Sequence, residues 1–136
     1  MATRARIGIQ LSDGSILSVY HHWDGYPEWL GRILRTHYNT QEKVAELIDG
    51  GDMSSCWTTE RWGTEEKAEE YGPQYYSQRG EDCPPRLDAT RFQYLSNGEE
   101  YAYLFLNDEW VCWNRNQYGE NKTPQFVEIP SGELAV

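Results

Sequence analysis

The segment between a predicted strand and a predicted helix carries the densest group of residues that could do chemistry. Residues 20–27 read YHHWDGYP. Amide groups at a helix N-terminus attract an anion, because they lack partners and carry the positive end of the helix dipole. His22 can donate a hydrogen bond and Asp24 supplies a carboxylate, so both could contact a ligand. The alternative to ligand binding is a structural role, in which Asp24 would cap the helix and Trp23 and Tyr26 would fill the core.

Pairs of arginine and aromatic residues recur further along the chain. Arg61 precedes Trp62, and Tyr76 stands three residues before Arg79, with Gln78 between them. An arginine can grip a phosphate while a neighbouring ring stacks on a base. These pairs therefore suit a nucleotide-like ligand. The alternative is ordinary cation–π packing within a loop.

The sequence predicts neither a bound metal nor a cofactor. Adjacent His21 and His22 would point to opposite faces of a strand, and His37 falls on the apolar side of a predicted helix. These histidines therefore do not form a set of metal ligands. The cysteines are widely spaced, with no Cys-x-x-Cys pair, and we expect them to be reduced; they are Cys56, Cys83 and Cys112.

A catalytic function has less support than a binding function. Acid–base catalysis needs paired titratable groups, and the candidate pairs are Asp24 with a histidine, and Glu81 or Asp82 with Arg79. Neither pair lies in a known catalytic motif, since the chain has no Gly-x-Ser-x-Gly elbow and no phosphate-binding loop. A small enzyme that uses His22 and Asp24 is kept as one alternative.

The elements that position these residues begin with a predicted hairpin over residues 6–21. Apolar residues alternate on both sides of an Asp-Gly turn, which is typical of hairpins. A helical hairpin is predicted over residues 27–50. Its first helix runs from Pro27 to Tyr38, and its second begins after Thr40 as N-cap and ends at a Gly-Gly pair.

The remaining chain is predicted as a loop region followed by strands. Residues 52–85 show little periodicity and indicate an irregular segment with a short exposed helix over 64–70. Residues 91–129 indicate a β-meander, with strands at 91–95, 101–106 and 110–114 and an edge strand at 126–129. The predicted fold is a single α+β domain over residues 1–136. An antiparallel sheet would join the N-terminal hairpin to the meander, with the helical hairpin packed on one face.

The charge of the chain excludes two classes of partner. The 136 residues include 12 Lys and Arg against 22 Asp and Glu, which gives a formal net charge of −10. Direct DNA binding and docking on an anionic membrane both need clustered positive charge. No run of residues is long and apolar enough to span a bilayer. The excess acid lies after residue 48, where it could mark a docking surface or only a solvated face.

Several short motifs carry a family resemblance. They are HWDGYPE at 22–28, GRIL at 31–34, HY at 37–38, KV at 43–44, LI at 47–48, GDMSS at 51–55 and YSQRGE at 76–81. With these motifs the chain resembles a group of small, uncharacterised proteins of bacteriophages and prophages that share a HWDGYP turn. The resemblance covers about residues 6–82 and brings no known active site.

A phage origin implies a role against bacterial immunity, because small acidic phage proteins often inhibit host defence. We expect a non-enzymatic, homo-oligomeric protein that sequesters a nucleotide-derived immune signal in the cytoplasm of the infected bacterium. Its ligand-binding residues would be His22, Trp23, Asp24, Tyr26, Arg32, Arg61, Trp62, Tyr76, Gln78 and Arg79. The main alternative partner is a bacterial defence protein. In that case the chain would be an acidic, anti-CRISPR-like inhibitor that occludes a nuclease or mimics nucleic acid.

Overall fold

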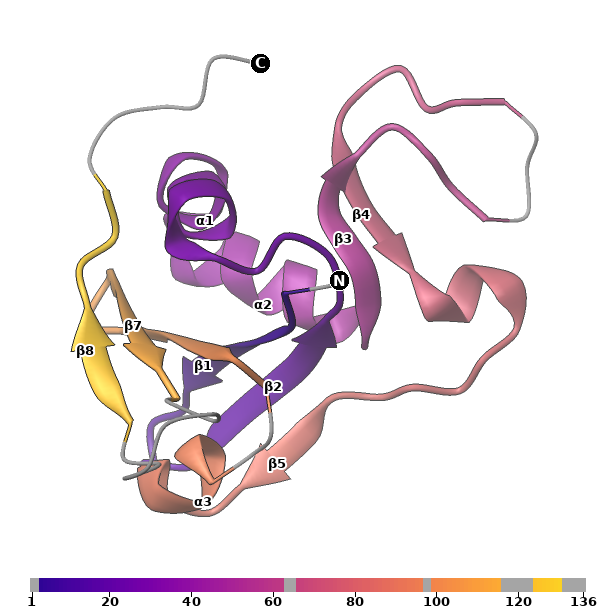
Figure 1. Ribbon diagram of the computed structural model, residues 1–136. Coiled ribbons are helices and arrows are strands. Elements are labelled where there is room, and N and C mark those ends of the chain that lie inside the picture. Colours follow the sequence, from indigo (N-terminus) through magenta and orange to yellow (C-terminus); the bar gives the residue numbers. More distant parts are fainter. Residues whose placement is uncertain (1–2, 63–65, 97–98, 116–123, 131–136) are drawn as a thin grey trace.

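The computed structural model is organised around one mixed β-sheet (Figure 1). It describes residues 3–62, 66–96, 99–115 and 124–130. Seven strands lie in the order β4-β3-β2-β1-β6-β7-β8, and an eighth, β5, pairs with β2. The strands are β1 (Ala5–Gln10), β2 (Ile16–His21), β3 (Met53–Thr58), β4 (Gly72–Tyr75), β5 (Arg86–Asp88), β6 (Tyr101–Leu106), β7 (Glu109–Asn114) and β8 (Gln125–Val127).

The N-terminal hairpin follows from the sequence pattern. β1 and β2 pair antiparallel along their whole length. Gly14 in the turn has φ +88°, a conformation that glycine adopts without strain. Asp13 Oδ1 accepts the backbone N–H of Ser15 at 2.9 Å and so closes the turn. The predicted hairpin over residues 6–21 is confirmed.

Two parallel pairings make the sheet mixed, so the prediction of a wholly antiparallel sheet is wrong. β1 pairs parallel with β6, and β2 pairs parallel with β3 at His21 and Met53. The helical hairpin explains the second pairing, because it carries the chain back across the sheet before β3 begins. The α+β class itself is confirmed, and β6 and β7 form the predicted antiparallel pair.

The predicted helical hairpin follows β2. Its first arm opens with a π-helical turn, η1 (Pro27–Gly31), and continues as α1 (Arg32–His37). Its second arm is α2 (Gln41–Asp49). The Thr40 side chain accepts the backbone N–H of Lys43 at 3.2 Å, so the predicted N-cap is confirmed.

The loop between β2 and η1 does not use Asp24 as its cap. The N-cap position belongs to Tyr26, which makes no side-chain capping hydrogen bond. The Gly25 N–H donates to the carbonyl of Thr3 at 2.8 Å, and a Cβ on Gly25 would lie 2.7 Å from that oxygen. Close approach of the N-terminal strand therefore requires the glycine, while Asp24 turns outward with φ +55°.

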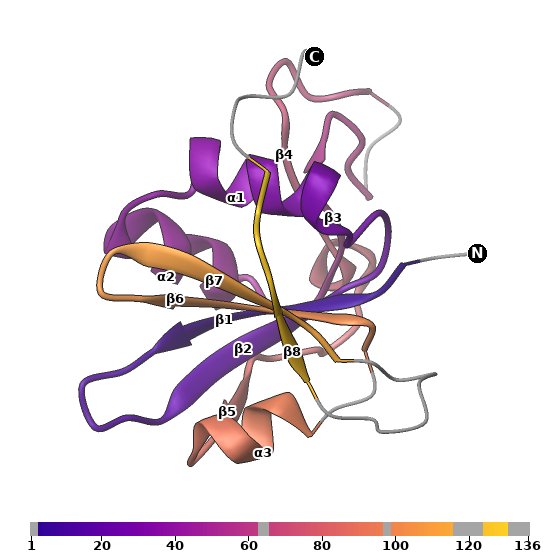
Figure 2. The same ribbon diagram turned by 60° about the vertical axis from the view of Figure 1, so that its left-hand side comes forward.

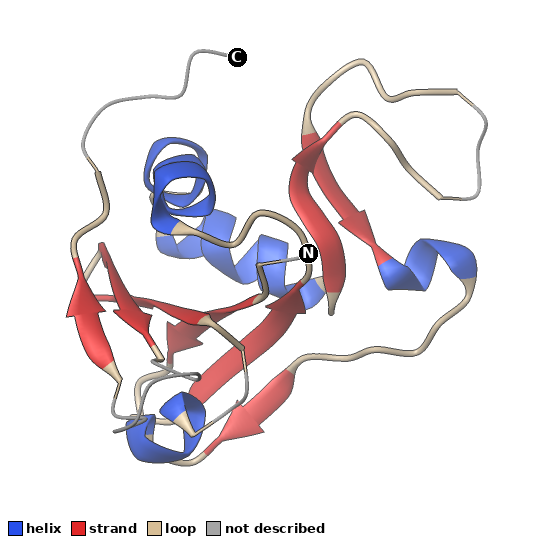
Figure 3. Ribbon diagram, viewed as in Figure 1, coloured by secondary structure: helices blue, strands red, loops and turns tan. Residues whose placement is uncertain are grey.

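The prediction of an irregular segment over residues 52–85 is wrong. This segment contains β3, β4 and the short 3₁₀ helix η2 (Tyr76–Arg79), and Figure 3 shows the two strands side by side. The sequence did not predict β3. Bulges break its register with β4, so buried and exposed side chains do not alternate regularly along the strand. Residues 66–70 are not helical, and residues 64–65 of the predicted helix lie outside the described residues.

Residues 91–95 form the helix α3 (Arg91–Leu95), so the prediction of a strand there is wrong. The Thr90 side chain caps this helix by accepting the Gln93 N–H at 3.2 Å. Phe92 and Tyr94 have the spacing of a strand, but only Tyr94 is buried, and Phe92 is 81% exposed. A side-chain cap and one anchoring ring thus outweigh the alternation in the sequence.

Helices cover both faces of the sheet (Figure 2). α1 and α2 lie on one face and enclose the larger core, which includes Ile7, Val19, Leu34, Leu47 and Tyr103. α3 lies on the other face over a smaller core around Tyr94 and Trp113. Among the described residues, no helix is long and apolar enough to cross a membrane.

Candidate functional site

The β3–β4 hairpin brings together four of the predicted ligand-binding residues. Trp62 follows β3, while Tyr76, Gln78 and Arg79 belong to η2 just after β4. The rings of Trp62 and Tyr76 stack with centroids 5.2 Å apart and an angle of 23° between their planes. Gln78 Oε1 accepts the Trp62 backbone N–H at 3.3 Å. With Glu81, these residues form what we call the aromatic–arginine cluster.

Arg79 is the centre of this cluster. Its guanidinium carbon lies 4.4 Å from the Trp62 ring centre and 5.0 Å from the Tyr76 ring centre. Its Nε donates to a carboxylate oxygen of Glu81, and this bond raises the pKa of Arg79 above its ordinary value. The side chains of Arg79 and Glu81 are 48% and 45% exposed, so solvent or a ligand can reach the pair.

The chemistry of the cluster is recognition. A planar guanidinium held over two rings presents hydrogen-bond donors in a fixed plane and suits a phosphate or carboxylate. Glu81 occupies one of those donors, the Nε of Arg79, so an anionic ligand group would compete with it there. The cluster contains no histidine or cysteine that could act as a base or nucleophile.

A second group forms at the end of β2. The Tyr20 hydroxyl lies 2.6 Å from His22 Nδ1, and the His22 and Trp23 rings meet edge to face with centroids 4.6 Å apart. Partial burial raises the pKa of Tyr20 to about 12, so its hydroxyl stays neutral. Trp23 is 49% exposed, and its backbone N–H donates to the carbonyl of Ser54 at 2.9 Å. His22 therefore contacts Tyr20 and Trp23, and no contact among the described residues joins it to Asp24.

Asp52 connects this second group to the aromatic–arginine cluster. Its Oδ1 accepts the backbone N–H of Tyr20 at 2.9 Å, and its carbonyl accepts the backbone N–H of Tyr76 at 3.1 Å. The Asp52 N–H donates to the carbonyl of Cys83 at 2.9 Å. β2 pairs with β5 up to Ser18 and with β3 from His21, so Asp52 occupies the fork between them. Burial raises the pKa of this carboxyl.

The face of β1 opposite α1 and α2 carries charged residues that the sequence argument missed. Arg6 is 6% exposed; it donates from Nε to Ser18 Oγ at 3.0 Å and lies 3.6 Å from Glu99. Arg4 pairs with Glu100 at 3.3 Å. The signal was present in the sequence, because Arg4 and Arg6 alternate with Ala5 and Ile7 and must face the other way.

The other predicted site residues lie elsewhere. Tyr26 is 37% exposed and occupies the N-cap position of η1. Arg32 begins α1, and its buried Nε has no hydrogen-bond partner among the described residues. Arg61 is committed to backbone carbonyls: its guanidinium donates to those of Thr58 and Glu60 at 2.6 and 2.7 Å. Arg61 thus braces the β3–β4 hairpin, and no contact in the described part of the chain joins Tyr26 or Arg32 to the cluster.

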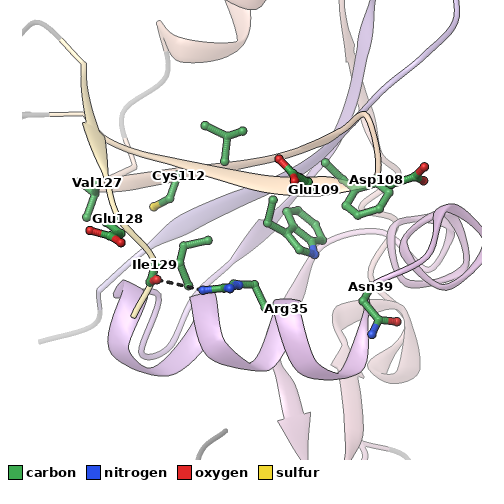
Figure 4. Close-up of a pocket in the computed structure, with 11 residues that line it drawn as sticks. Arg35, Asn39, Asp108, Glu109, Cys112, Val127, Glu128 and Ile129 are labelled. Atoms are coloured by element: carbon green, nitrogen blue, oxygen red, sulfur yellow. Dashed lines mark hydrogen bonds between the residues drawn. The ribbon is translucent and has the colours of Figure 1, made fainter. Parts of the chain in front are cut away.

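A pocket of about 420 Å³ lies between α1 and the strands β7 and β8 (Figure 4). Arg35 reaches across it and donates to the carbonyl of Ile129 at 3.0 Å, and carboxylates of Asp108, Glu109 and Glu128 surround its rim. None of the predicted ligand-binding residues lines it. Arg35 holds the chain after β8 against α1, so this arrangement serves the packing of the edge strand.

The metal-ligating side chains and the cysteines do not gather into one site in the described residues. They contain no group of three His, Cys, Asp or Glu side chains that could hold a metal ion. The three cysteines are free, and burial raises the pKa of Cys112 to about 12 and that of Cys56 further. Such thiols stay protonated and unreactive.

Comparison with known proteins gives no relative. No family model matches the chain, and no match was found among curated proteins or solved structures. The function is therefore argued from the geometry of the described residues.

Proposed function

We propose that the protein is a non-enzymatic binding protein that sequesters a nucleotide-like ligand on the aromatic–arginine cluster. The observation that carries the proposal is the position of Arg79 over both Trp62 and Tyr76. These residues come from the segments that follow β3 and β4 and meet with the chemistry expected for a phosphate beside a base. The phage resemblance adds the proposed setting: the ligand is an immune signal in the cytoplasm of the infected bacterium.

The ligand would bind by replacing an internal ion pair. Its phosphate takes the place of the Glu81 carboxylate on Arg79, and its base packs against the Trp62–Tyr76 pair. A stack on one aromatic ring contributes roughly 1–3 kcal/mol, which suits a ligand with several bases or several phosphates. Sharing of clusters between subunits in a homo-oligomer would increase the retention of such a ligand.

The binding test uses purified protein and a panel of linear and cyclic nucleotides. The protein is incubated with each nucleotide, separated from free ligand and then denatured by heat, and the released material is identified by mass. Release of the intact nucleotide supports sequestration. Release of an altered nucleotide would instead show an enzyme. Absence of bound nucleotide across the panel contradicts the proposal and favours the alternative of direct inhibition of a defence protein.

Variants of the cluster locate the site. Arg79→Ala should weaken capture at least tenfold, and Arg79→Lys should also weaken it, because lysine keeps the charge but not the planar donor set. Glu81→Gln should strengthen capture, since it removes the competing anion and one negative charge. The matched control is Arg91→Ala, because Arg91 also lies over a tryptophan, 5.8 Å from the ring centre of Trp113. That variant should bind like the wild type.

A further inference from the structure

A second cavity, with a different chemistry, lies between α2 and the start of β4. Its volume is about 430 Å³, and three of its walls are the tyrosines Tyr38, Tyr71 and Tyr75. It shares no residue with the aromatic–arginine cluster. Three aromatic rings around one cavity are typical of sites that recognise organic cations, because ring faces carry partial negative charge.

The tyrosine rings are held in place from outside the cavity. Tyr71 stacks on Trp57 with centroids 5.5 Å apart, and Trp57 stacks on His37 at 3.9 Å. One face of Tyr71 is therefore covered, while 48% of the residue stays exposed. The Tyr38 hydroxyl donates to the carbonyl of Cys56 at 3.3 Å. These contacts fix two rings before any ligand arrives, which lowers the entropy lost on binding.

Tyr75 lies directly on the end of α2. Its hydroxyl donates to the carbonyl of Leu47 at 2.6 Å. A Cβ on Gly50 would lie 2.2 Å from the Tyr75 ring, so only glycine at this position leaves room for it. The close packing makes the third ring as rigid as the other two.

The charges around the cavity favour a cation. Glu46 and Asp49 on α2 line it, and the C-terminal end of that helix adds partial negative charge. Burial raises the pKa of Tyr75, and the nearby charges of Glu46 and Asp49 raise it further. Two positive side chains oppose them: Lys43 at the rim, and Arg61, whose guanidinium is already bound to backbone carbonyls.

We propose that this cavity binds a small organic cation with a methylated ammonium group. Such a group is large enough to touch several rings, carries its charge on weakly hydrated methyl groups and needs no hydrogen-bond acceptor. The hydroxyl protons of Tyr38 and Tyr75 are already committed to carbonyls, so these two tyrosines offer their aromatic rings and not a hydrogen-bond donor. A phosphate-bearing ligand is repelled by Glu46 and Asp49.

The test compares choline with 3,3-dimethyl-1-butanol, which has the same shape but no charge. Binding is followed by chemical shifts of the aromatic protons in the full chain. Choline should shift the Tyr71, Tyr75 and Trp57 resonances and bind at least tenfold more tightly than the alcohol. Equal binding of the two compounds would show a merely apolar cavity and overturn the proposal. Absence of choline binding at high millimolar concentration would overturn it as well.

Variants separate the rings from the charges. Tyr71→Ala should weaken choline binding about tenfold, whereas Tyr71→Phe keeps the ring and should bind like the wild type. Glu46→Gln leaves every ring in place and should weaken choline binding a few-fold. This variant therefore tests the cavity if Tyr71→Ala does not fold. Tyr26→Ala, which removes an exposed tyrosine outside the cavity, is the control. Unchanged binding in both Tyr71→Ala and Glu46→Gln refutes the assignment.

This cavity is independent of the proposed nucleotide site. Arg79→Ala should weaken nucleotide capture at least tenfold and leave choline binding unchanged. Loss of both activities in that variant would mean that the two regions form one site, which contradicts the inference.

Discussion

His21 couples the stability of the fold to pH. Its ring is fully buried on β2, and Nε2 accepts the backbone N–H of Cys56 at 3.1 Å. The proton of the neutral ring must then sit on Nδ1, which is buried and has no hydrogen-bond partner among the described residues. Burial, and to a smaller extent the neighbouring His22, lower the pKa of His21 to about 3. The folded protein therefore keeps this ring neutral at pH 5.

The size of the loss in the free energy of unfolding follows from the difference between the pKa of His21 in the folded and unfolded states. The unfolded chain binds a proton at His21 below pH 6.5, while the folded chain does not until about pH 3. The unfolded state thus gains stability as the pH falls, and the free energy of unfolding decreases between pH 6.5 and 3. From pH 7 to pH 5 the loss from this one residue is ~2 kcal/mol, since each pKa unit corresponds to 1.36 kcal/mol. Nothing is lost above pH 7.

The assay is denaturant unfolding of the wild type and of His21→Gln at pH 7 and pH 5. Glutamine can accept the Cys56 N–H through its side-chain oxygen but does not titrate. The wild type should lose ~2 kcal/mol more than the variant between the two pH values. His22→Gln is the control: it keeps His21, so its loss between pH 7 and pH 5 should stay close to that of the wild type even though it removes the smaller His22 contribution to the His21 pKa. Equal losses in the wild type and His21→Gln would refute the reasoning.

Three further substitutions test the packing around the sites by thermal and denaturant unfolding. Gly51→Ala should cost more than about 1 kcal/mol, because Gly51 has φ +88° and a Cβ would lie 2.2 Å from the Cys83 carbonyl oxygen. Normal stability in that variant would contradict the close approach of the two segments. Tyr94→Phe should cost about 1–3 kcal/mol, since its buried hydroxyl bonds the Tyr103 carbonyl at 2.5 Å. Thr40→Ala should cost about 1 kcal/mol through loss of the α2 N-cap, whereas Thr40→Ser should cost little.

The sequence predictions are accurate where the structure depends on neighbours in the chain and fail where it depends on contacts between distant segments. The hairpin over residues 6–21 and the cap at Thr40 depend on neighbours in the chain, and both are confirmed. The strand predicted at 91–95 is a helix, because Tyr94 anchors it against a distant sheet and Thr90 caps it. β3 was missed for a similar reason, since its irregular register is set by β4 and by the fork at Asp52.

For the candidate site, too, the sequence indicated the residue types, whereas the tertiary structure decided which of these residues meet. Residue types in the sequence indicated aromatic and arginine recognition, and Trp62, Tyr76, Gln78 and Arg79 do meet. The sequence offered no means to separate them from Arg61, which has the same type of neighbours but binds backbone carbonyls. Nor could it place Asp52 between Tyr20 and Tyr76, because that position depends on where two strands diverge.

The sequence by itself determined the α+β class, the N-terminal hairpin, the helical pair and the acidic balance of the chain. Each of these depends on local periodicity, turn chemistry or composition, which do not require knowledge of distant contacts. Only the tertiary structure decided the parallel pairings of β1 with β6 and β2 with β3. It also decided which rings enclose a cavity and which arginine stays accessible. Those features arise where segments far apart in the chain compete for the same neighbours, and packing, not pattern, selects among them.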